Sequence, residues 1–101
     1  MKPIRLYLDE AITRGLVKND ADIARRLDVA RATVSRWRAG EKAPEDDQAI
    51  ALAQMLGKPE GELLAECAAA RAKSATARAA WERIAKLASM TAASAALGVV
   101  T

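Results

Sequence analysis

Basic side chains that can bind a polyanion are concentrated in one short stretch of the chain, residues 14–42. That stretch holds eight lysines and arginines against four acids. Residues 45–66 have the opposite balance, with six acids and one lysine, and residues 71–101 are basic again, with five cations and one glutamate. Because opposite charges are segregated along the chain, we expect an oriented polyanionic partner rather than general adhesion to acidic molecules.

The residue types that enzymes and metal sites depend on are scarce. The chain has no histidine, and Cys67 is its one cysteine, which excludes an internal disulfide framework and a multi-cysteine zinc site. The acids Glu45, Asp46 and Asp47 are consecutive and point different ways on a helix, so we interpret them as charges at a helix start. No nucleophile–base pair or phosphate-binding loop is present. We therefore expect no enzymatic activity, no cofactor and no metal, and a buried Cys67.

The elements that must position the basic residues are helices. Apolar residues make up 51% of the 101 residues, aromatic residues only 3%, and alanine and leucine dominate. No strand alternation occurs. The apolar spacing predicts helices over about 3–14, 20–27 (capped by Asp20), 30–39, 45–56, 59–70 and 71–86.

Residues 20–40 fit two helices packed at a steep angle across a tight turn. Ala24 is small where the helices approach most closely, and Asp28 stands four positions later, where the turn needs a left-handed backbone. Val29 then plugs the turn, and Val34 and Trp37 face back onto the first helix. The expected core of this motif is Ile23, Ala24, Leu27, Asp28, Val29, Val34 and Trp37.

The run from Asp22 to Gly40, read with Lys42-Ala-Pro44 and residues 49–57, resembles the lambda-repressor-like, or Xre-type, helix-turn-helix regulators. The shared features are the Ile-Ala pair, the Val-Ser-x-Trp core, the glycine that follows and the proline that opens the next helix. The resemblance covers about residues 4–66. It implies an all-α fold: a five-helix DNA-binding domain over residues 1–70, with a C-terminal helical extension over residues 71–101. The continuation from Arg71 to Arg83 resembles a subgroup carried by phages and prophages.

Three residues depart from the family's usual pattern. Asp28 stands where glycine is usual in the turn, and Arg38 where glutamate often follows the tryptophan. Asp20 stands where a glutamine often opens the second helix and braces a phosphate. The phosphate contact at that position is therefore not carried over to this chain.

The resemblance implies a sequence-specific DNA-binding transcriptional regulator, a phage-type repressor of the cytoplasm that is nucleoid-associated when bound. Its partner is double-stranded DNA, read in the major groove by the helix at about 30–39. The alternative is a protein-interaction module of the same fold, an antirepressor without DNA affinity of its own. Expected base contacts are Arg31, Ala32 and Arg36, and expected phosphate or base contacts are Thr33, Ser35, Lys18, Arg38 and Lys42.

Family behaviour also implies a homodimer, with half-sites about one helical turn apart. The uncharged tail, residues 87–101, admits three readings: a packing or dimerisation helix, a loosely ordered segment, or an abortive membrane segment. Its length falls short of the roughly 20 residues needed to span a bilayer, so a membrane role is not expected and we favour a helix–helix contact. The dimerisation candidates in the extension are Trp81, Ile84, Leu87 and Ala88.

Overall fold

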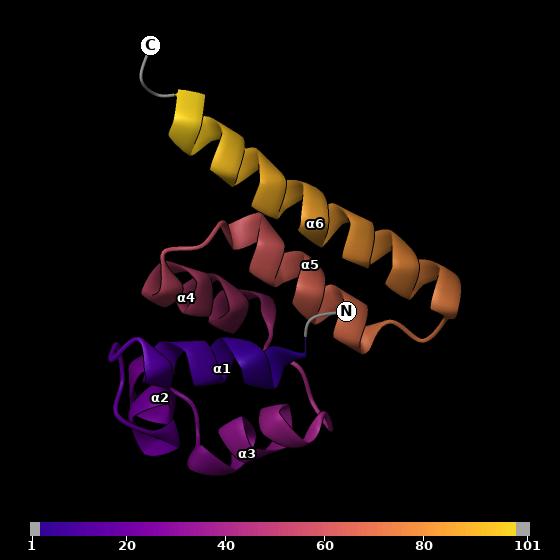
Figure 1. Cartoon of the computed structure of the whole chain (residues 1–101). Coiled ribbons are helices and arrows are strands. Elements are labelled where there is room, and N and C mark those ends of the chain that lie inside the picture. Colours follow the sequence, from indigo (N-terminus) through magenta and orange to yellow (C-terminus); the bar gives the residue numbers. More distant parts are fainter. Residues whose placement is uncertain (1–2, 99–101) are drawn as a thin grey trace.

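The computed structural model describes residues 3–98, with side chains described as far as Met90. This part of the chain is all-helical, with no strand, as the sequence predicts. Its six helices follow one another through short connections (Figure 1). They are α1 (Ile4–Thr13), α2 (Asp20–Leu27), α3 (Arg31–Ala39), α4 (Asp46–Leu56), α5 (Glu60–Arg71) and α6 (Ala75–Gly98).

One apolar core joins the first five helices. Leu8 of α1, Ile23 of α2, Leu52 of α4 and Leu63 of α5 are each fully buried in it. Trp37 of α3 is the largest of the fully buried side chains, and it supplies aromatic bulk to a core that contains no phenylalanine. The helix-turn-helix is therefore held on a rigid helical base, which fixes where the outer face of α3 points.

Helix α1 buries one polar side chain, Tyr7, in the core. Tyr7 is 1% exposed, and its hydroxyl donates to the Glu62 carboxylate on α5 at 2.8 Å, with Glu66 Oε2 at 3.4 Å. Burial raises the pKa of Tyr7, and the hydrogen bond to Glu62 raises it further. The neutral phenol thus ties α1 to α5, and these two acids belong to the interior rather than to a solvated acidic face.

The helix starts show one correction. The cap of α2 is Asn19, whose side-chain oxygen accepts from the backbone N–H of Asp22 at 2.9 Å, and Asp20 is the first helical residue instead of the cap. Asparagine and aspartate are equally good caps, so adjacent candidates cannot be separated by residue type. The start of α4 is closed by Glu45 and Gln48, where the Glu45 N–H donates to Gln48 Oε1 at 2.9 Å.

Helix α6 continues well beyond the predicted end near residue 86, and it packs mainly against α5. Figure 1 shows α6 on the side of the molecule opposite α3, with its C-terminal half running past the start of α5. Gly61 and Ala88 meet where the two helices cross, because small residues let helix backbones approach closely. Residues 99–101 of the predicted tail lie outside the described part. No helix in residues 3–98 is long and apolar enough to cross a membrane.

Candidate nucleic-acid interface

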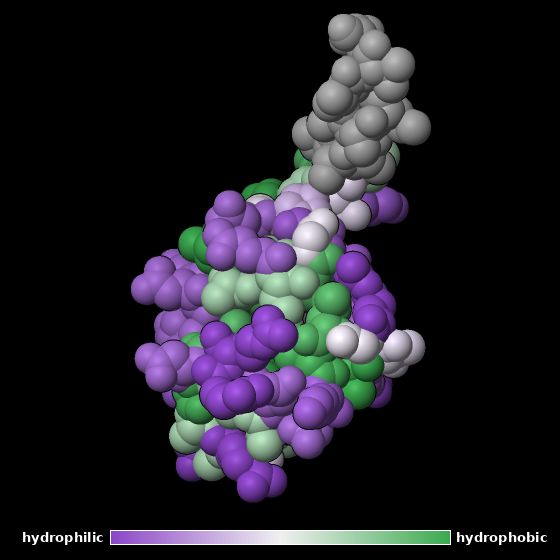
Figure 2. Space-filling view, turned by 90° about the vertical axis from the view of Figure 1, so that its left-hand side faces the viewer, coloured by the Kyte–Doolittle hydropathy of each residue, from purple (hydrophilic) through white to green (hydrophobic). Residues whose placement is uncertain are grey.

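Helix α3 turns one face into the core and the other to solvent. Val34 and Trp37 are 0% and 1% exposed. The opposite face carries Arg31, Ala32 and Arg36, all exposed. The lower end of the molecule, where α3 lies in Figure 1, is covered mainly by hydrophilic residues in Figure 2. Of the two hydroxyl residues, Ser35 is exposed and Thr33 is half-buried.

The turn between α2 and α3 sets the angle of α3. Asp28 ends α2 with φ 56° and ψ 50°, in the left-handed region, and is the one non-glycine residue of positive φ in the described chain. The Val29 N–H donates back to the Ala24 carbonyl at 2.9 Å, which closes the turn. Of the motif's expected core, Ile23, Ala24 and Leu27 are buried, Val29 is half-buried and the Asp28 side chain is exposed.

The guanidinium of Arg38, at the end of α3, is bound by two carboxylates of the protein. Its Nε and Nη2 donate to the two carboxylate oxygens of Asp20 at 2.6 and 2.8 Å, and its Nη1 donates to Asp9 at 2.7 Å. These hydrogen bonds, the one with Asp20 first, raise the pKa of Arg38. A DNA phosphate would have to compete with two carboxylates for this guanidinium. The sequence did not single out Asp9, and only its three-dimensional proximity to Arg38 reveals its role.

Two further arginines of the helix-turn-helix are exposed but also have partners within the chain. Arg25 pairs with Asp22 on the same helix, and Arg26 donates to the Leu16 carbonyl at 3.1 Å. The Arg25 hydrogen bond, followed by the bond from the Lys18 backbone N–H, lowers the pKa of Asp22. Arg25 and Arg26 therefore have partners other than a polyanion.

The remaining basic side chains of the motif have no internal partner. Among the side chains that the structure describes, up to Met90, no hydrogen bond or ion pair engages those of Arg31, Arg36, Lys18 or Lys42, and all four residues are exposed. The structure thus divides the basic residues of the sequence into two groups. One group braces the motif, and the other presents cations to solvent on α3 and in the loops before α2 and after α3.

The expected dimerisation residues lie on α6, away from this surface. Trp81, Ile84 and Leu87 are 40%, 46% and 61% exposed. Ala88 differs from them, since it is half-buried and its Cβ would lie 3.4 Å from a Cβ atom added to Gly61 of α5. The structure therefore separates Ala88, which packs within the chain, from three large apolar residues that remain on the surface.

Potential metal ligands do not gather in the described residues. No cluster of three or more potential ligands is found in the part of the chain that the structure describes. Glu45, Asp46 and Asp47 are exposed at the start of α4, where the helix dipole favours acids. Cys67 is buried, as expected, and burial raises the pKa of its thiol to about 12.

Two family models match adjacent parts of the chain. The family described as "Helix-turn-helix" matches residues 18–63, and the family described as "Phage related protein" matches residues 64–101. The boundary between the two matches lies within α5. No curated protein matches the chain, and no solved structure does. The chain therefore carries a DNA-binding helix-turn-helix domain of the Xre and lambda-repressor-like kind, followed by a phage-related region.

Proposed function

We propose that this protein is a sequence-specific transcriptional repressor that reads the major groove with α3. The observation that carries this proposal is the pairing pattern of its arginines. Arg31 and Arg36 are exposed on α3 without an internal partner, while Arg25, Arg26 and Arg38 are engaged by other groups of the protein. Free guanidinium groups on a rigid, outward helix face suit base contacts, because they need not break internal bonds first.

The roles of individual residues follow from their positions on α3. Arg31 and Arg36 can each pair bidentately with guanine O6 and N7, which is the commonest specific contact in the major groove. Ala32 lies between them on the exposed face, where its methyl group can meet a thymine methyl. These three residues would give the protein its sequence preference.

Contacts to the DNA backbone would come from the ends of the motif. Lys18 precedes α2 and Lys42 follows α3, and both are exposed. Ser35 and Thr33 lie along α3 and can donate to phosphates or to base edges. Lysine at such positions supplies affinity and register rather than sequence information. We expect Arg38 to contribute less to these backbone contacts, since Asp20 and Asp9 already bind its guanidinium.

We further propose that the repressor acts as a homodimer on the nucleoid, in the cytoplasm. One module of this size contacts too little DNA for high specificity, so two copies on an inverted repeat are needed. The exposed Trp81, Ile84 and Leu87 of α6 supply an apolar surface for the second copy. We place the boundary between the DNA-binding domain, residues 1–70, and the extension, residues 71–101, where α5 ends.

The test is a fluorescence-anisotropy titration with DNA from the protein's own promoter and with random DNA, each at two salt concentrations. Wild type is expected to prefer its own promoter and to lose affinity as salt rises, because binding releases counterions. The double variant Arg31→Ala/Arg36→Ala should lose the preference, at about 1–3 kcal/mol for each guanine contact. Arg83→Ala, an exposed arginine of α6, is the matched control and should bind as wild type does.

The opposite outcome points to a different function. If wild type binds neither DNA at low salt, the repressor proposal fails. The same helices would then act on a protein partner, as an antirepressor does.

A further inference from the structure

The loop that follows α3, residues 40–45, carries Lys42, one of the expected phosphate contacts. The first part of the loop is closed onto α3. Gly40 takes a left-handed conformation with φ 77°, and the Glu41 N–H donates to the Arg36 carbonyl at 3.0 Å. Lys42 comes next and is exposed. Its position relative to DNA therefore depends on how the rest of the loop is held.

The second part of the loop is held by Arg71, the last residue of α5. Ala43 is 6% exposed and Pro44 is fully buried, so this part of the backbone lies against the core. Arg71 Nη1 donates to the Pro44 carbonyl at 2.6 Å, and Arg71 Nη2 donates to Asp46 Oδ1 at 3.3 Å. One guanidinium thus joins the end of α5 to the backbone two residues beyond Lys42.

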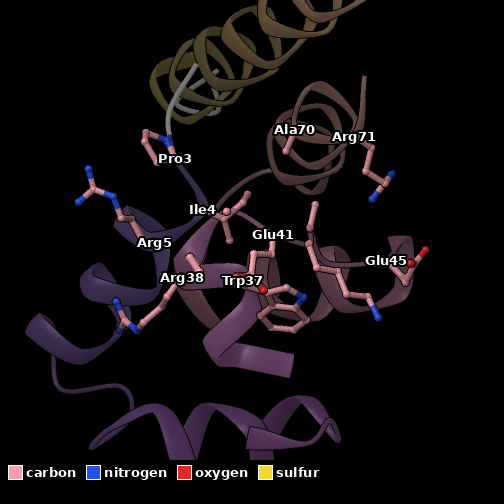
Figure 3. A pocket seen from close by; sticks show the side chains of 13 residues that line it. Pro3, Ile4, Arg5, Trp37, Arg38, Glu41, Glu45, Ala70 and Arg71 are labelled. Carbon is pink, nitrogen blue, oxygen red and sulfur yellow. The ribbon is translucent and has the colours of Figure 1, made fainter. Parts of the chain in front are cut away.

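A cavity of about 450 Å³ lies between α5 and the end of α3. Trp37 and Lys42 line it on one side, and Arg71 lines it on the other (Figure 3). Figure 3 shows Arg71 extending from α5 towards the chain at Glu45, where α4 begins. Residues on the two sides of a cavity lose packing contacts there, so the hydrogen bonds of Arg71 are the stronger tie between α5 and the loop.

The end of α5 is itself a fixed support for this arginine. Cys67, one turn earlier, is fully buried in the core. Arg78, in the first turn of α6, donates to the Ala72 carbonyl at 3.3 Å, which holds the residue that follows Arg71. Arg71 belongs to the phage-related region and Pro44 to the helix-turn-helix domain, so their hydrogen bond joins the two parts of the chain.

We propose that Arg71 is a positioning residue for DNA binding: by holding the Pro44 carbonyl, it sets where Lys42 meets a DNA phosphate. This inference rests on the proposed DNA binding, and it adds a residue from outside the DNA-binding domain. Arg71 acts without touching DNA, because both of its bonded nitrogens are turned to groups of the protein. Phosphate contacts give affinity and register, so a displaced Lys42 contributes less to both.

The test measures the slope of log K against log[salt] for DNA from the protein's own promoter, with the full chain and its variants. Lys42→Ala removes the phosphate contact and should lower the slope by about 0.9. Arg71→Ala should lower the slope by up to about 0.9 as well, because the displaced lysine no longer meets the phosphate. In the double variant, the loss should equal that of Lys42→Ala alone.

Lys73→Ala is the matched control, since it removes the same charge from an exposed residue two positions beyond Arg71. It should leave the slope unchanged. A second measurement needs no DNA: by nuclear magnetic resonance, the backbone amide signals of residues 41–43 should shift in Arg71→Ala and stay in place in Lys73→Ala. Circular dichroism checks that each variant is folded, and Arg71→Met, which keeps the apolar stem, replaces an alanine variant that does not fold.

Three results would overturn the proposal while wild type still binds its promoter. Slope losses of Arg71→Ala and Lys42→Ala that add up would show that Arg71 contacts a phosphate directly. An unchanged slope, or unchanged amide signals, in Arg71→Ala would leave Arg71 with a structural role alone. An unchanged slope in Lys42→Ala would remove the contact that Arg71 is meant to position. Wild type that binds no DNA is a different outcome, because it overturns the repressor proposal and this one with it.

Discussion

Arg38 and Asp20 are 18 residues apart in the sequence, and they form a bidentate pair at 2.6 and 2.8 Å that ties the end of α3 to the start of α2. Both residues depart from the pattern of the family that the chain resembles, in which glutamate often stands at the position of Arg38 and glutamine often at that of Asp20. The two departures thus compensate each other within this chain. Asp9 of α1 binds the same guanidinium at 2.7 Å, so one arginine joins α1 to both helices of the motif.

We expect this pair to stabilise the fold and to orient α3, with little direct contact to DNA. Arg38→Ala and Asp20→Ala should each lower the free energy of unfolding, and the double variant should reveal a coupling of about 1 kcal/mol, since the pair is partly solvated. Chemical denaturation of the four proteins measures this coupling. Additive effects of the two substitutions would contradict the expectation.

A DNA-binding measurement on Arg38→Ala can distinguish two roles of Arg38, the orientation of α3 and a direct contact to a DNA phosphate. Loss of one phosphate contact reduces the slope of log K against log[salt] by about 0.9. If Arg38 orients α3, its removal should weaken binding and leave this slope unchanged. Lys42→Ala, which we expect to lose a phosphate contact, is the comparison that should lower the slope.

The all-helical fold was predictable because the helices of this chain carry strong local signals. Gly40 and Gly57 stop α3 and α4 in left-handed conformations, and Pro59 precedes α5. The left-handed turn at Asp28 was likewise predictable, since its spacing from Ala24 and Val29 requires it. Such signals act over a few residues and can be read without knowledge of the tertiary structure.

The interior role of several polar residues was not predictable from the sequence. Glu62 and Glu66 look like part of an acidic surface, and only the packing of Tyr7 against α5 shows that they are buried. The partners of Arg38 and the cavity at Trp37 likewise depend on segments that are far apart in the chain. Periodicity reveals which face of a helix is apolar, but not which distant side chain meets it.

The turn residue Asp28 gives a prediction about stability. Its φ of 56° is unfavourable for a side chain with a Cβ atom, although aspartate tolerates it better than most residues. Asp28→Gly should therefore raise the free energy of unfolding by up to about 1 kcal/mol, net of the entropy that glycine loses on folding. Thermal and urea unfolding would measure this, and Asp28→Ala, which keeps the Cβ atom, should bring no gain. A lower stability of the glycine variant would show that the aspartate side chain stabilises the turn in another way.

The thiol of Cys67 should be unreactive in the folded protein. Burial raises its pKa to about 12, so the thiolate that reacts with disulfide reagents is almost absent at pH 8. We expect a thiol-exchange reagent to label the protein only as fast as it unfolds, and to label it at once in denaturant.

The same shift predicts a pH dependence of stability. The folded protein disfavours the Cys67 thiolate. The protonated thiol therefore contributes fully to the free energy of unfolding below the ordinary thiol pKa, and this contribution falls as the pH rises towards 12. Cys67→Ala should remove this part of the alkaline destabilisation. Fast labelling of the native protein at pH 8 would contradict the burial on which both expectations rest.

The exposed apolar residues of α6 make the proposed dimer testable. Ile84 and Leu87 are 46% and 61% exposed, and burying such side chains is worth about 1.5–3 kcal/mol each relative to full exposure. Leu87→Asp and Ile84→Asp should therefore weaken dimerisation at least tenfold, as measured by analytical ultracentrifugation, and should reduce operator affinity with it. Ala79→Asp adds the same charge at another exposed position of α6 and should dimerise as wild type does.

The dimer experiment also separates the two parts of the proposed function. A monomer at every concentration, with intact preference for the promoter, would remove the dimer and keep α3 as the reader. Wild-type association of Ile84→Asp and Leu87→Asp would instead place the second copy elsewhere on the molecule. Because α6 lies opposite α3 in Figure 1, neither substitution touches the DNA-binding face, so any loss of operator affinity reports on assembly.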